Sequence, residues 1–356
     1  MFRGFSKSCF VIAILWTTVP AAVKGAAVTD YLNVKAYTEF VSAPGSNKTF
    51  NYSGKGVFYS FPASGTARIV FEDLARWTYR PTVQITPRSN SGKSMPACGA
   101  RLETEGYHLV AIVTCRPGSV VATKPEFTLL IVDETSDAAY TLVTSCTNCG
   151  KANIHNPWAR NDLNPVRVQY LTGRTGVFFK MDAKPPVTEF APPMAFVTPV
   201  SSAVSCEVFS IGSKAERADE YGVEIACTVA RSTSPTAIPQ PPVDMSFHLL
   251  LVPRSARTAT IFAAENGDTW MSSSEAGLIE ARRTSTGRYL VSFANLAYRW
   301  ADDGIALVTS HGAGGKTCSL EGQYKSGDDV EIAVVCRNAS GDLVDSRFLV
   351  MATSRH

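Results

Sequence analysis

Cys146 and Cys149 form the motif with the most direct chemical potential in this sequence. A Cys-x-x-Cys pair can act as a redox dithiol, supply half of a zinc site or close a local disulfide. A thioredoxin-like site needs a helix N-terminus within an alternating β/α pattern, and the sequence shows neither feature. A zinc site needs two more ligands, of which only His155 lies nearby. The pair therefore predicts a local disulfide, with a metal site and a reactive dithiol as alternatives, and we predict no bound metal.

Other motifs of enzymes and cofactor-binding proteins are incomplete. Residues 87–94 and 310–317 resemble phosphate-binding loops, but both lack the first glycine and neither opens a helix, so they are interpreted as polar loops between strands. Beyond the N-terminal signal there is neither a Gly-x-Ser-x-Gly elbow nor a His-Glu-x-x-His helix. The sequence thus predicts no cofactor and no catalytic residue, although a triad assembled from distant residues would leave no local pattern.

Six further cysteines fall into three similar pairs. The members of each pair are 17, 21 and 18 residues apart, and polar or glycine-containing turn signals lie midway between them. Such spacing is typical of a β-hairpin whose two cysteines face each other across its open end, within disulfide reach. The predicted bonds are Cys98–Cys115, Cys206–Cys227 and Cys318–Cys336.

The alternation of side chains supports these hairpins. Val330, Ile332 and Val334 share one strand face with Cys336, and the second cysteine of each other pair also continues an apolar face. Closing a loop of this length stabilises a fold by about 3 kcal/mol in the chain-entropy model. Three structural disulfides are therefore favoured over redox or metal chemistry for these six residues.

Landmarks recur along the chain in the same order. Short strands ending at 85–87, 197–199 and 308–310 each precede one cysteine hairpin, and a strand beginning with phenylalanine follows it. In the first and third copies, a Phe-x-x-Leu-Ala segment precedes a tryptophan, Trp77 or Trp300. A period of roughly 100 residues suits a small autonomous domain repeated three times.

The predicted fold class is all-β. Each repeat offers several short strands separated by turn signals and no useful helix-period segment, which favours antiparallel β-sandwiches or small barrels. The predicted organisation is a signal peptide at 1–27, β repeats at 30–135 and 256–356, and between them a β repeat with proline-rich insertions at 136–255.

The N-terminal segment has the features of a secretory signal. Arg3 and Lys7 precede an apolar stretch that is too short to span a bilayer well, and small residues around Gly25 and Ala27 fit cleavage. Cleavage would remove three of 34 basic residues and none of the 31 acidic ones, leaving no net charge. It would also remove Cys9, leaving an even number of cysteines. These features predict a secreted, periplasmic or cell-surface protein with no integral membrane segment and no affinity for nucleic acid through bulk charge.

The third repeat carries a resemblance to a known group of sequences. Its segments 286–291, 334–336 and 341–348, with Cys318, resemble a tandem repeat of secreted bacterial proteins that have no assigned activity. The first two repeats match less well. The resemblance implies export and disulfides, and it implies no catalytic residue.

The second repeat departs from the others by its loops. It contains the Cys146–Cys149 segment, a loop with Trp158, and proline runs that include Pro235, Pro239, Pro241 and Pro242. Proline-rich segments favour extended, solvated backbone, as in a long surface loop or a recognition loop presented by a rigid scaffold. As a recognition loop, this segment with Trp158 would bind a glycan or protein partner.

Two classes of function follow from these features. An exported, non-catalytic binding or surface/adhesion protein is favoured by the repetition, the low charged fraction of 18% and the lack of catalytic motifs. The alternative is a secreted hydrolase with an inter-domain cleft that acts on a polysaccharide or a protein. A deep pocket lined by convergent carboxylates, histidines or serines would favour the enzyme.

Overall fold

The computed structural model of the chain is built almost entirely of β-strands. It describes residues 34–41, 47–88, 97–116, 124–133, 138–143, 151–155, 166–171, 174–180, 193–213, 220–229, 246–252, 258–273, 278–297, 304–312 and 315–353. Within these ranges, no helix has the length and apolar character needed to cross a membrane.

Twenty-four strands are described, and we group them into three units of eight. Unit 1 contains β1 (Val34–Phe40), β2 (Lys48–Asn51), β3 (Val57–Ala63), β4 (Thr66–Phe71), the 3-10 helix η1 (Leu74–Trp77), β5 (Thr82–Pro87), β6 (Ala97–Glu105), β7 (His108–Arg116) and β8 (Phe127–Val132). Unit 2 contains β9 (Ala139–Val143), β10 (Lys151–His155), β11 (Val166–Leu171), β12 (Arg174–Lys180), β13 (Met194–Pro199), β14 (Val204–Ser213), β15 (Glu220–Val229) and β16 (Phe247–Val252). Unit 3 contains β17 (Thr258–Ala263), β18 (Thr269–Ser273), β19 (Ile279–Ser285), β20 (Arg288–Phe293), β21 (Ile305–His311), β22 (Thr317–Ser326), β23 (Asp329–Arg337) and β24 (Arg347–Thr353).

The same strand order recurs in the three units. In unit 1 one sheet has the order β2-β1-β8-β5 and the other β3-β4-β7-β6, and units 2 and 3 repeat both orders with their own strands. All pairings within a unit are antiparallel, and the sheets are open rather than closed into barrels. The all-β prediction is therefore confirmed, and of the two predicted architectures the sandwich describes these sheets.

Three hydrophobic clusters hold the sheets together. One lies wholly in unit 1 and combines β4 and β7 side chains with those of β5 and β8, and a second does the same in unit 3. The third fills unit 2 and also takes in Tyr37 and Leu130 of unit 1 and Leu307 and Met351 of unit 3. Strands such as β8 and β24 are consequently covered on both faces, which explains their nearly continuous burial.

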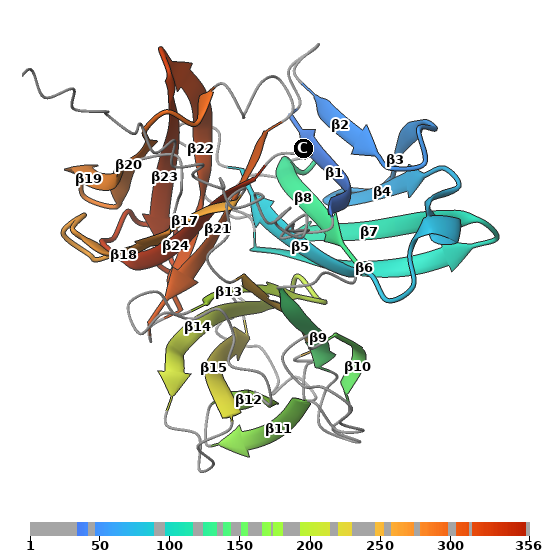
Figure 1. Ribbon diagram of the computed structural model, residues 1–356, viewed down its shortest axis with the longest axis horizontal. Coiled ribbons are helices and arrows are strands. Elements are labelled where there is room, and N and C mark those ends of the chain that lie inside the picture. The colour runs from blue at the N-terminus through green and yellow to red at the C-terminus, as the bar shows by residue number, and fades with distance from the viewer. Residues whose placement is uncertain are drawn as a thin grey trace, which may run out of the picture.

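Three equivalent threonines join the units in a ring. Thr86 Oγ1 of unit 1 accepts a hydrogen bond from Val308 N of unit 3 at 2.8 Å. Thr198 Oγ1 of unit 2 accepts from Ile85 N of unit 1 at 2.9 Å, and Thr309 Oγ1 of unit 3 accepts from Val197 N of unit 2 at 3.4 Å. The three lobes in Figure 1 accordingly meet where β5, β13 and β21 lie.

Backbone pairing also crosses between units. β14 of unit 2 meets β21 of unit 3 through one parallel pair, Val208 and His311, and this pair links two four-stranded sheets into one of eight strands. An isolated parallel bridge joins Arg88 of unit 1 to Leu320 of unit 3. One sheet and one core therefore extend across the boundaries between units. The division into three separately cored domains, with boundaries near 135 and 255, remains a prediction.

Gly99 of unit 1 lies against the backbone of unit 2, at the junction of these two units. A Cβ at Gly99 would lie 2.7 Å from the carbonyl carbon of Ser201 and 2.9 Å from Pro199 O, which are rigid backbone atoms. We expect Gly99→Ala to lower the free energy of unfolding by about 1–3 kcal/mol through overpacking, measured by urea denaturation. Gly176→Ala is the matched control because its Cβ would meet mainly the end of the Phe178 ring. Equal stability of the two variants would contradict this tight junction.

The three predicted disulfides are present. Cys98 pairs with Cys115, Cys206 with Cys227 and Cys318 with Cys336, and in each case the two cysteines are direct partners across one antiparallel hairpin. Cys146 and Cys149 lie outside the described residues.

Candidate functional site

The binding surface predicted in the second repeat lies outside the described residues. This applies to Trp158 and to all four prolines of the predicted recognition loop: Pro235, Pro239, Pro241 and Pro242. The surfaces described below consist of residues within the described ranges.

A hollow lies where the three units meet. It contains about 400 Å³ of space free of protein atoms, part of which is open solvent. Its lining combines equivalent residues of the units: Ile85, Pro87, Ala97, Cys98, Val197, Pro199, Val204, Ser205, Cys206, Val308, Thr309, Ser310, Thr317 and Cys318. These are apolar or hydroxyl side chains and cysteines already bonded in disulfides, so among the described residues the lining offers no carboxylate or imidazole as a general base.

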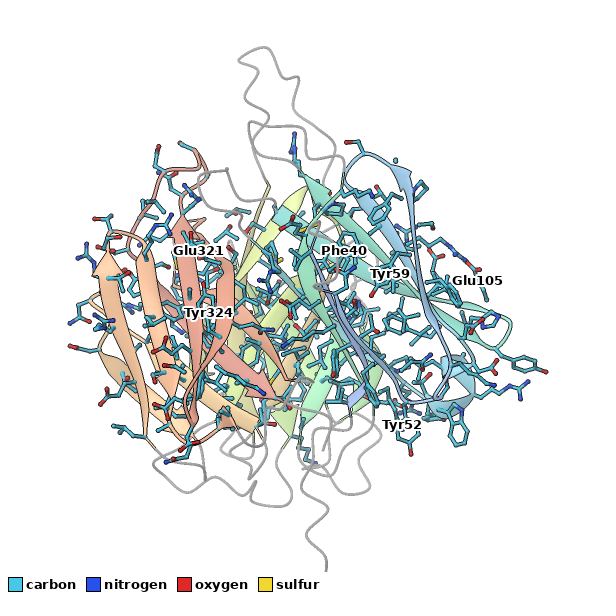
Figure 2. All side chains as sticks on the ribbon, turned by 90° about the horizontal axis from the view of Figure 1, so that it is seen from above. Phe40, Tyr52, Tyr59, Glu105, Glu321 and Tyr324 are labelled. Atoms are coloured by element: carbon cyan, nitrogen blue, oxygen red, sulfur yellow. A yellow bond between two sulfur atoms is a disulfide. The ribbon has the colours of Figure 1, made fainter. Side chains whose placement is uncertain are left out.

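Several large aromatic side chains of unit 1 are exposed, and two of them are in ring contact. Tyr52, Trp77, Tyr79 and Tyr107 are 50%, 54%, 71% and 59% exposed, and we call these four residues the aromatic face. The Tyr52 and Trp77 rings meet edge to face, with centroids 5.9 Å apart. Tyr52 projects from the lower edge of unit 1 in Figure 2. Of the eight large hydrophobic side chains exposed in the described part of the chain, five belong to unit 1, so the exposure is concentrated there.

A short turn after β4 presents Trp77. Asp73 adopts a left-handed conformation with φ of 55°, which aspartate tolerates better than most residues, and it ends the strand. Leu74 is fully buried and anchors η1, while Ala75 N donates to Tyr107 O at 3.0 Å. This turn places Trp77 on the surface and fixes η1 against the β6–β7 hairpin.

Hydrogen bonds also fix the backbone that carries Tyr79 and Tyr52. Asp133 is buried and accepts from the backbone N–H groups of Tyr79 at 2.7 Å and Arg80 at 2.9 Å. Tyr52 N donates to Lys35 O at 2.9 Å, and the Asn51 side chain donates to Glu72 O at 3.0 Å. The rings are thus carried by backbone that is already ordered in the unbound protein.

Three cations lie against three of the four rings. The Arg76 guanidinium is 3.6 Å from the Tyr107 centroid, and that of Arg80 is 4.8 Å from the Tyr79 centroid. Lys35 Nζ lies 4.3 Å from the Tyr52 centroid. Burial lowers the pKa of Lys35, and the nearby Asp133 carboxylate partly offsets this effect. The surface therefore combines π-faces with positive charge.

Of these four residues, the sequence singled out only Trp77, and only as a landmark of the repeats. Trp77 was expected to follow the Phe-x-x-Leu-Ala segment, which becomes the end of β4 and the start of η1. Tyr52, Tyr79 and Tyr107 carry no local signal, because single exposed aromatic residues are ordinary in any sequence. Their gathering depends on which turns the fold brings together.

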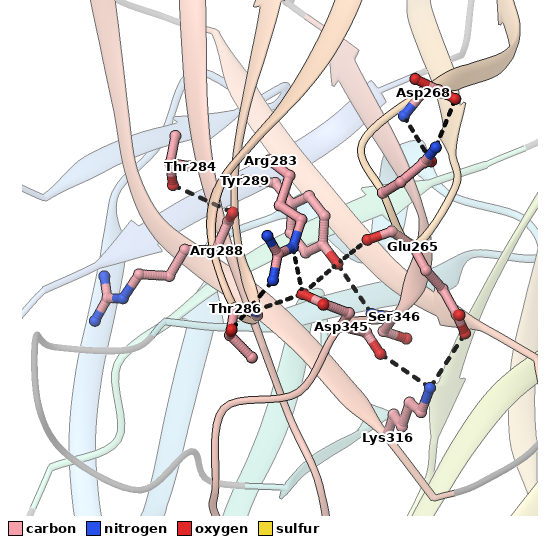
Figure 3. Close-up of polar contacts among 12 residues, drawn as sticks. Glu265, Asp268, Arg283, Thr284, Thr286, Arg288, Tyr289, Lys316, Asp345 and Ser346 are labelled. Atoms are coloured by element: carbon pink, nitrogen blue, oxygen red, sulfur yellow. Dashed lines mark hydrogen bonds and ion pairs between the residues drawn. The ribbon is translucent and has the colours of Figure 1, made fainter.

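Unit 3 contains a polar network that is satisfied internally (Figure 3). Asp345 Oδ1 accepts from Arg283 Nε at 2.9 Å and from Gly287 N at 2.8 Å. The hydrogen bond from Arg283 is the main reason that the pKa of Asp345 is lowered. Lys316 Nζ donates to Asp345 O at 2.9 Å and pairs with Glu265. Because these groups bind one another, the network ties the β19–β20 turn to β24 rather than presenting groups to a ligand.

Tyr289 is the buried centre of that network. Its hydroxyl donates to Glu265 O at 2.9 Å and accepts from Ser346 N at 3.0 Å, and Ser346 is fully buried. We expect Tyr289→Phe to destabilise the protein by about 1–3 kcal/mol, because the Ser346 N–H loses its acceptor. Thermal and urea unfolding test this, with Tyr324→Phe on the exposed face of β22 as the control. A loss below about 0.5 kcal/mol would show that the hydroxyl has no such role.

The described histidines and acidic residues do not assemble a metal site. Within the described ranges, no group of three or more His, Cys, Asp or Glu side chains is placed to hold a metal ion. His108 Nδ1 accepts from Asp73 N at 3.2 Å, and His248 Nδ1 lies 3.3 Å from Thr82 Oγ1. These two imidazoles therefore have structural partners.

The chain was compared with protein-family models, with curated proteins and with solved structures. None of them matches it, so the resemblance of the third repeat to exported bacterial repeats stays a prediction.

Proposed function

We propose that this chain is an exported, non-catalytic protein that binds a glycan through the aromatic face of unit 1. The observation that carries the proposal is the concentration of four exposed aromatic rings on turns held by hydrogen bonds: Tyr52, Trp77, Tyr79 and Tyr107.

The physical chemistry of sugars suits such a surface. The C–H face of a pyranose ring is apolar and flat, and it stacks on an indole or phenol ring while the hydroxyl groups stay hydrated. Large rigid rings give much contact area at little cost in side-chain entropy. Because Asp133 and the Tyr107 carbonyl already order the backbone beneath the rings, binding has less loop ordering to oppose it.

Export is supported by the disulfides. Three hairpin disulfides form and persist in oxidising compartments, where extracellular polymers are encountered. The predicted signal peptide points to the same location. A surface protein made of disulfide-closed β units suits adhesion to such polymers.

The hydrolase alternative has less support. A cleft between units would have to supply a pair of carboxylates or a nucleophile with a base. The described residues that line the hollow between the units are apolar residues, hydroxyl-bearing residues and disulfide cysteines, and they include neither of those constellations.

The experiment measures retention of the purified protein in affinity electrophoresis through gels containing hydroxyethyl cellulose, glycol chitin, polygalacturonate, alginate or heparin. We expect the wild type to bind at least one of these polymers and Trp77→Ala to bind it at least tenfold more weakly. Tyr324→Ala is the matched control, since Tyr324 is 52% exposed on unit 3. Unchanged binding by Trp77→Ala, or binding of no polymer by the wild type, would contradict the proposal.

A further inference from the structure

A buried carboxamide, a hydroxyl and an imidazole lie together at the junction of units 1 and 2, where the lobes meet in Figure 1. Thr198 of β13 is fully buried, and its Oγ1 donates a hydrogen bond to Gln84 Oε1 of β5 at 3.0 Å. Gln84 is 2% exposed, and none of the described residues offers a hydrogen-bond partner to its Nε2 atom. His248 of β16 is the direct cross-strand partner of Thr198, so the two side chains lie on the same face of their sheet.

The surroundings of Thr198 favour loss of its hydroxyl proton. Ile85 N donates to Thr198 Oγ1 at 2.9 Å, and this hydrogen bond stabilises negative charge that develops on the oxygen. Burial lowers the pKa of His248 to about 4, so its ring is neutral at pH 7 and is able to accept a proton. His248 Nδ1 lies 3.3 Å from Thr82 Oγ1, and when Nδ1–H donates to that oxygen the lone pair of the ring is on Nε2. These groups supply the parts of an activated nucleophile: a hydroxyl, a base and a third group that orients the base.

The two equivalent threonines have different surroundings. Thr86 and Thr309 accept a backbone hydrogen bond from the next unit, as the threonine of unit 2 does. The residue before the backbone donor is Leu307 for Thr86 and Phe196 for Thr309, whereas unit 1 offers Gln84 at this position. Their cross-strand partners are a threonine and a leucine rather than a histidine. Joining the units therefore requires neither the carboxamide nor the imidazole, and these two groups are left for another role.

From this arrangement we propose that Thr198 and Gln84 form an ester that links units 1 and 2 covalently. Thr198 Oγ1 attacks Gln84 Cδ, and His248 accepts the hydroxyl proton. The Oγ1–Cδ bond forms and the Cδ–Nε2 bond breaks, and the proton leaves with the nitrogen as ammonia, so the step needs no oxidant and no other reactant. Because both side chains are buried, water that would hydrolyse the ester is excluded.

The ester joins two residues that are 114 positions apart in the sequence. It holds units 1 and 2 together under a pulling force that would break the hydrogen bond between the same two side chains. The link is independent of the aromatic face, so a chain without the ester is expected to bind glycans as the wild type does.

Peptide mapping by mass spectrometry tests the proposal on the oxidised, full-length wild type. After unfolding, reduction and alkylation of the cysteines, trypsin releases residues 77–88, which contain Gln84, and residues 181–214, which contain Thr198. We expect these two peptides to be linked, with a mass lower than the sum of the free peptides by one ammonia, about 17 Da. Alkaline hydroxylamine should separate them, because it cleaves esters far faster than amides. Recovery of the two peptides only in their free forms overturns the proposal.

Variants assign the roles of the residues. Thr198→Val removes the nucleophile and His248→Gln removes the base, so each should give the two peptides in free form. Thr198→Ser keeps a hydroxyl group and should stay linked, which distinguishes a lost nucleophile from a disturbed junction. Thr86→Val is the matched control, because it removes an equivalent threonine and should leave the link intact. A linked Thr198→Val variant overturns the ester, and a His248→Gln variant linked as fully as the wild type overturns the role of the imidazole.

Discussion

Lowering the pH from 7 to 5 is expected to destabilise this protein by about 2 kcal/mol or more, because histidines that are buried in the junctions between units bind protons in the unfolded chain over this range and stay largely neutral in the folded protein. His248 of β16 is 2% exposed, and it meets Thr82 of β5 across the junction of units 1 and 2. Burial lowers the pKa of His248 to about 4.

The sign of the effect follows from the two states. In the unfolded chain a histidine has a pKa of about 6.5, so it binds a proton there before it does in the folded protein. The stabilisation is therefore complete above pH 6.5 and is lost as the pH falls towards 4. Each pH unit in this window costs at most about 1.4 kcal/mol per histidine.

His311 adds to the effect at the junction of units 2 and 3. His311 is the parallel β-bridge partner of Val208 of β14, and the centroid of its ring lies 4.5 Å from the centroid of the Phe262 ring. Burial, and to a smaller extent the positive charge of Arg347, lowers the pKa of His311 to about 4. Its contribution is expected to be smaller than that of His248, because it is only partly buried.

Urea denaturation of the oxidised protein at pH 7 and pH 5 measures this loss. His248→Gln keeps a polar partner for Thr82 and does not titrate, so its stability should fall about 2 kcal/mol less than that of the wild type between the two pH values. A His248→Gln variant with the full pH dependence of the wild type would show that the junction histidine is not responsible.

Removal of one hairpin disulfide is the second large effect that we expect. Cys318 and Cys336 are almost completely buried, and their bond closes 18 residues of chain. Replacing both by alanine should lower the free energy of unfolding by about 3 kcal/mol, chiefly because the unfolded chain regains the entropy that the loop had lost.

The control is the same pair of substitutions measured under reduction. With dithiothreitol present, the wild type and the Cys318→Ala, Cys336→Ala variant should differ by much less than they do when oxidised. A variant as stable as the oxidised wild type would mean that the hairpin is held by its strand pairing and core contacts alone.

The hairpins could be predicted from sequence because their signals are local. The cysteine spacing, the turn midway between the cysteines and the apolar residues on the strand face of the second cysteine all lie within about 20 residues. These signals sufficed to predict the Cys98–Cys115 bond and the other two disulfides. The strands that precede and follow each hairpin, such as β5 and β8, were also recognisable, since their residues favour β-structure.

How the units pack together could not be predicted in the same way. Thr86 was visible only as part of the strand end at 85–87 that recurs at 197–199 and 308–310, whereas its partner Val308 lies 222 residues further along the chain. No local pattern specifies a contact at that distance. The burial of β8 on both faces, likewise, depends on a core shared with the neighbouring units.

The candidate site shows the same limit. Trp77 was noticed as a landmark, but Tyr52, Tyr79 and Tyr107 acquire meaning only when η1 and two turns are brought together by bonds such as that from Ala75 N to Tyr107 O. Proline content drew attention to residues 235–242 instead, and these lie outside the described residues.

The central claim is that a glycan binds on the aromatic face, and mapping the bound glycan by NMR tests it most directly. Spectra of ¹⁵N-labelled protein would be recorded with a short oligosaccharide of the polymer that binds most tightly in affinity electrophoresis, and Trp77→Phe would assign the Trp77 indole signal. We predict that the oligosaccharide shifts this indole signal and the backbone amides of residues 52–54, 76–80 and 107. Shifts confined to other parts of the chain, with the Trp77 indole signal unmoved at saturation, would contradict the account.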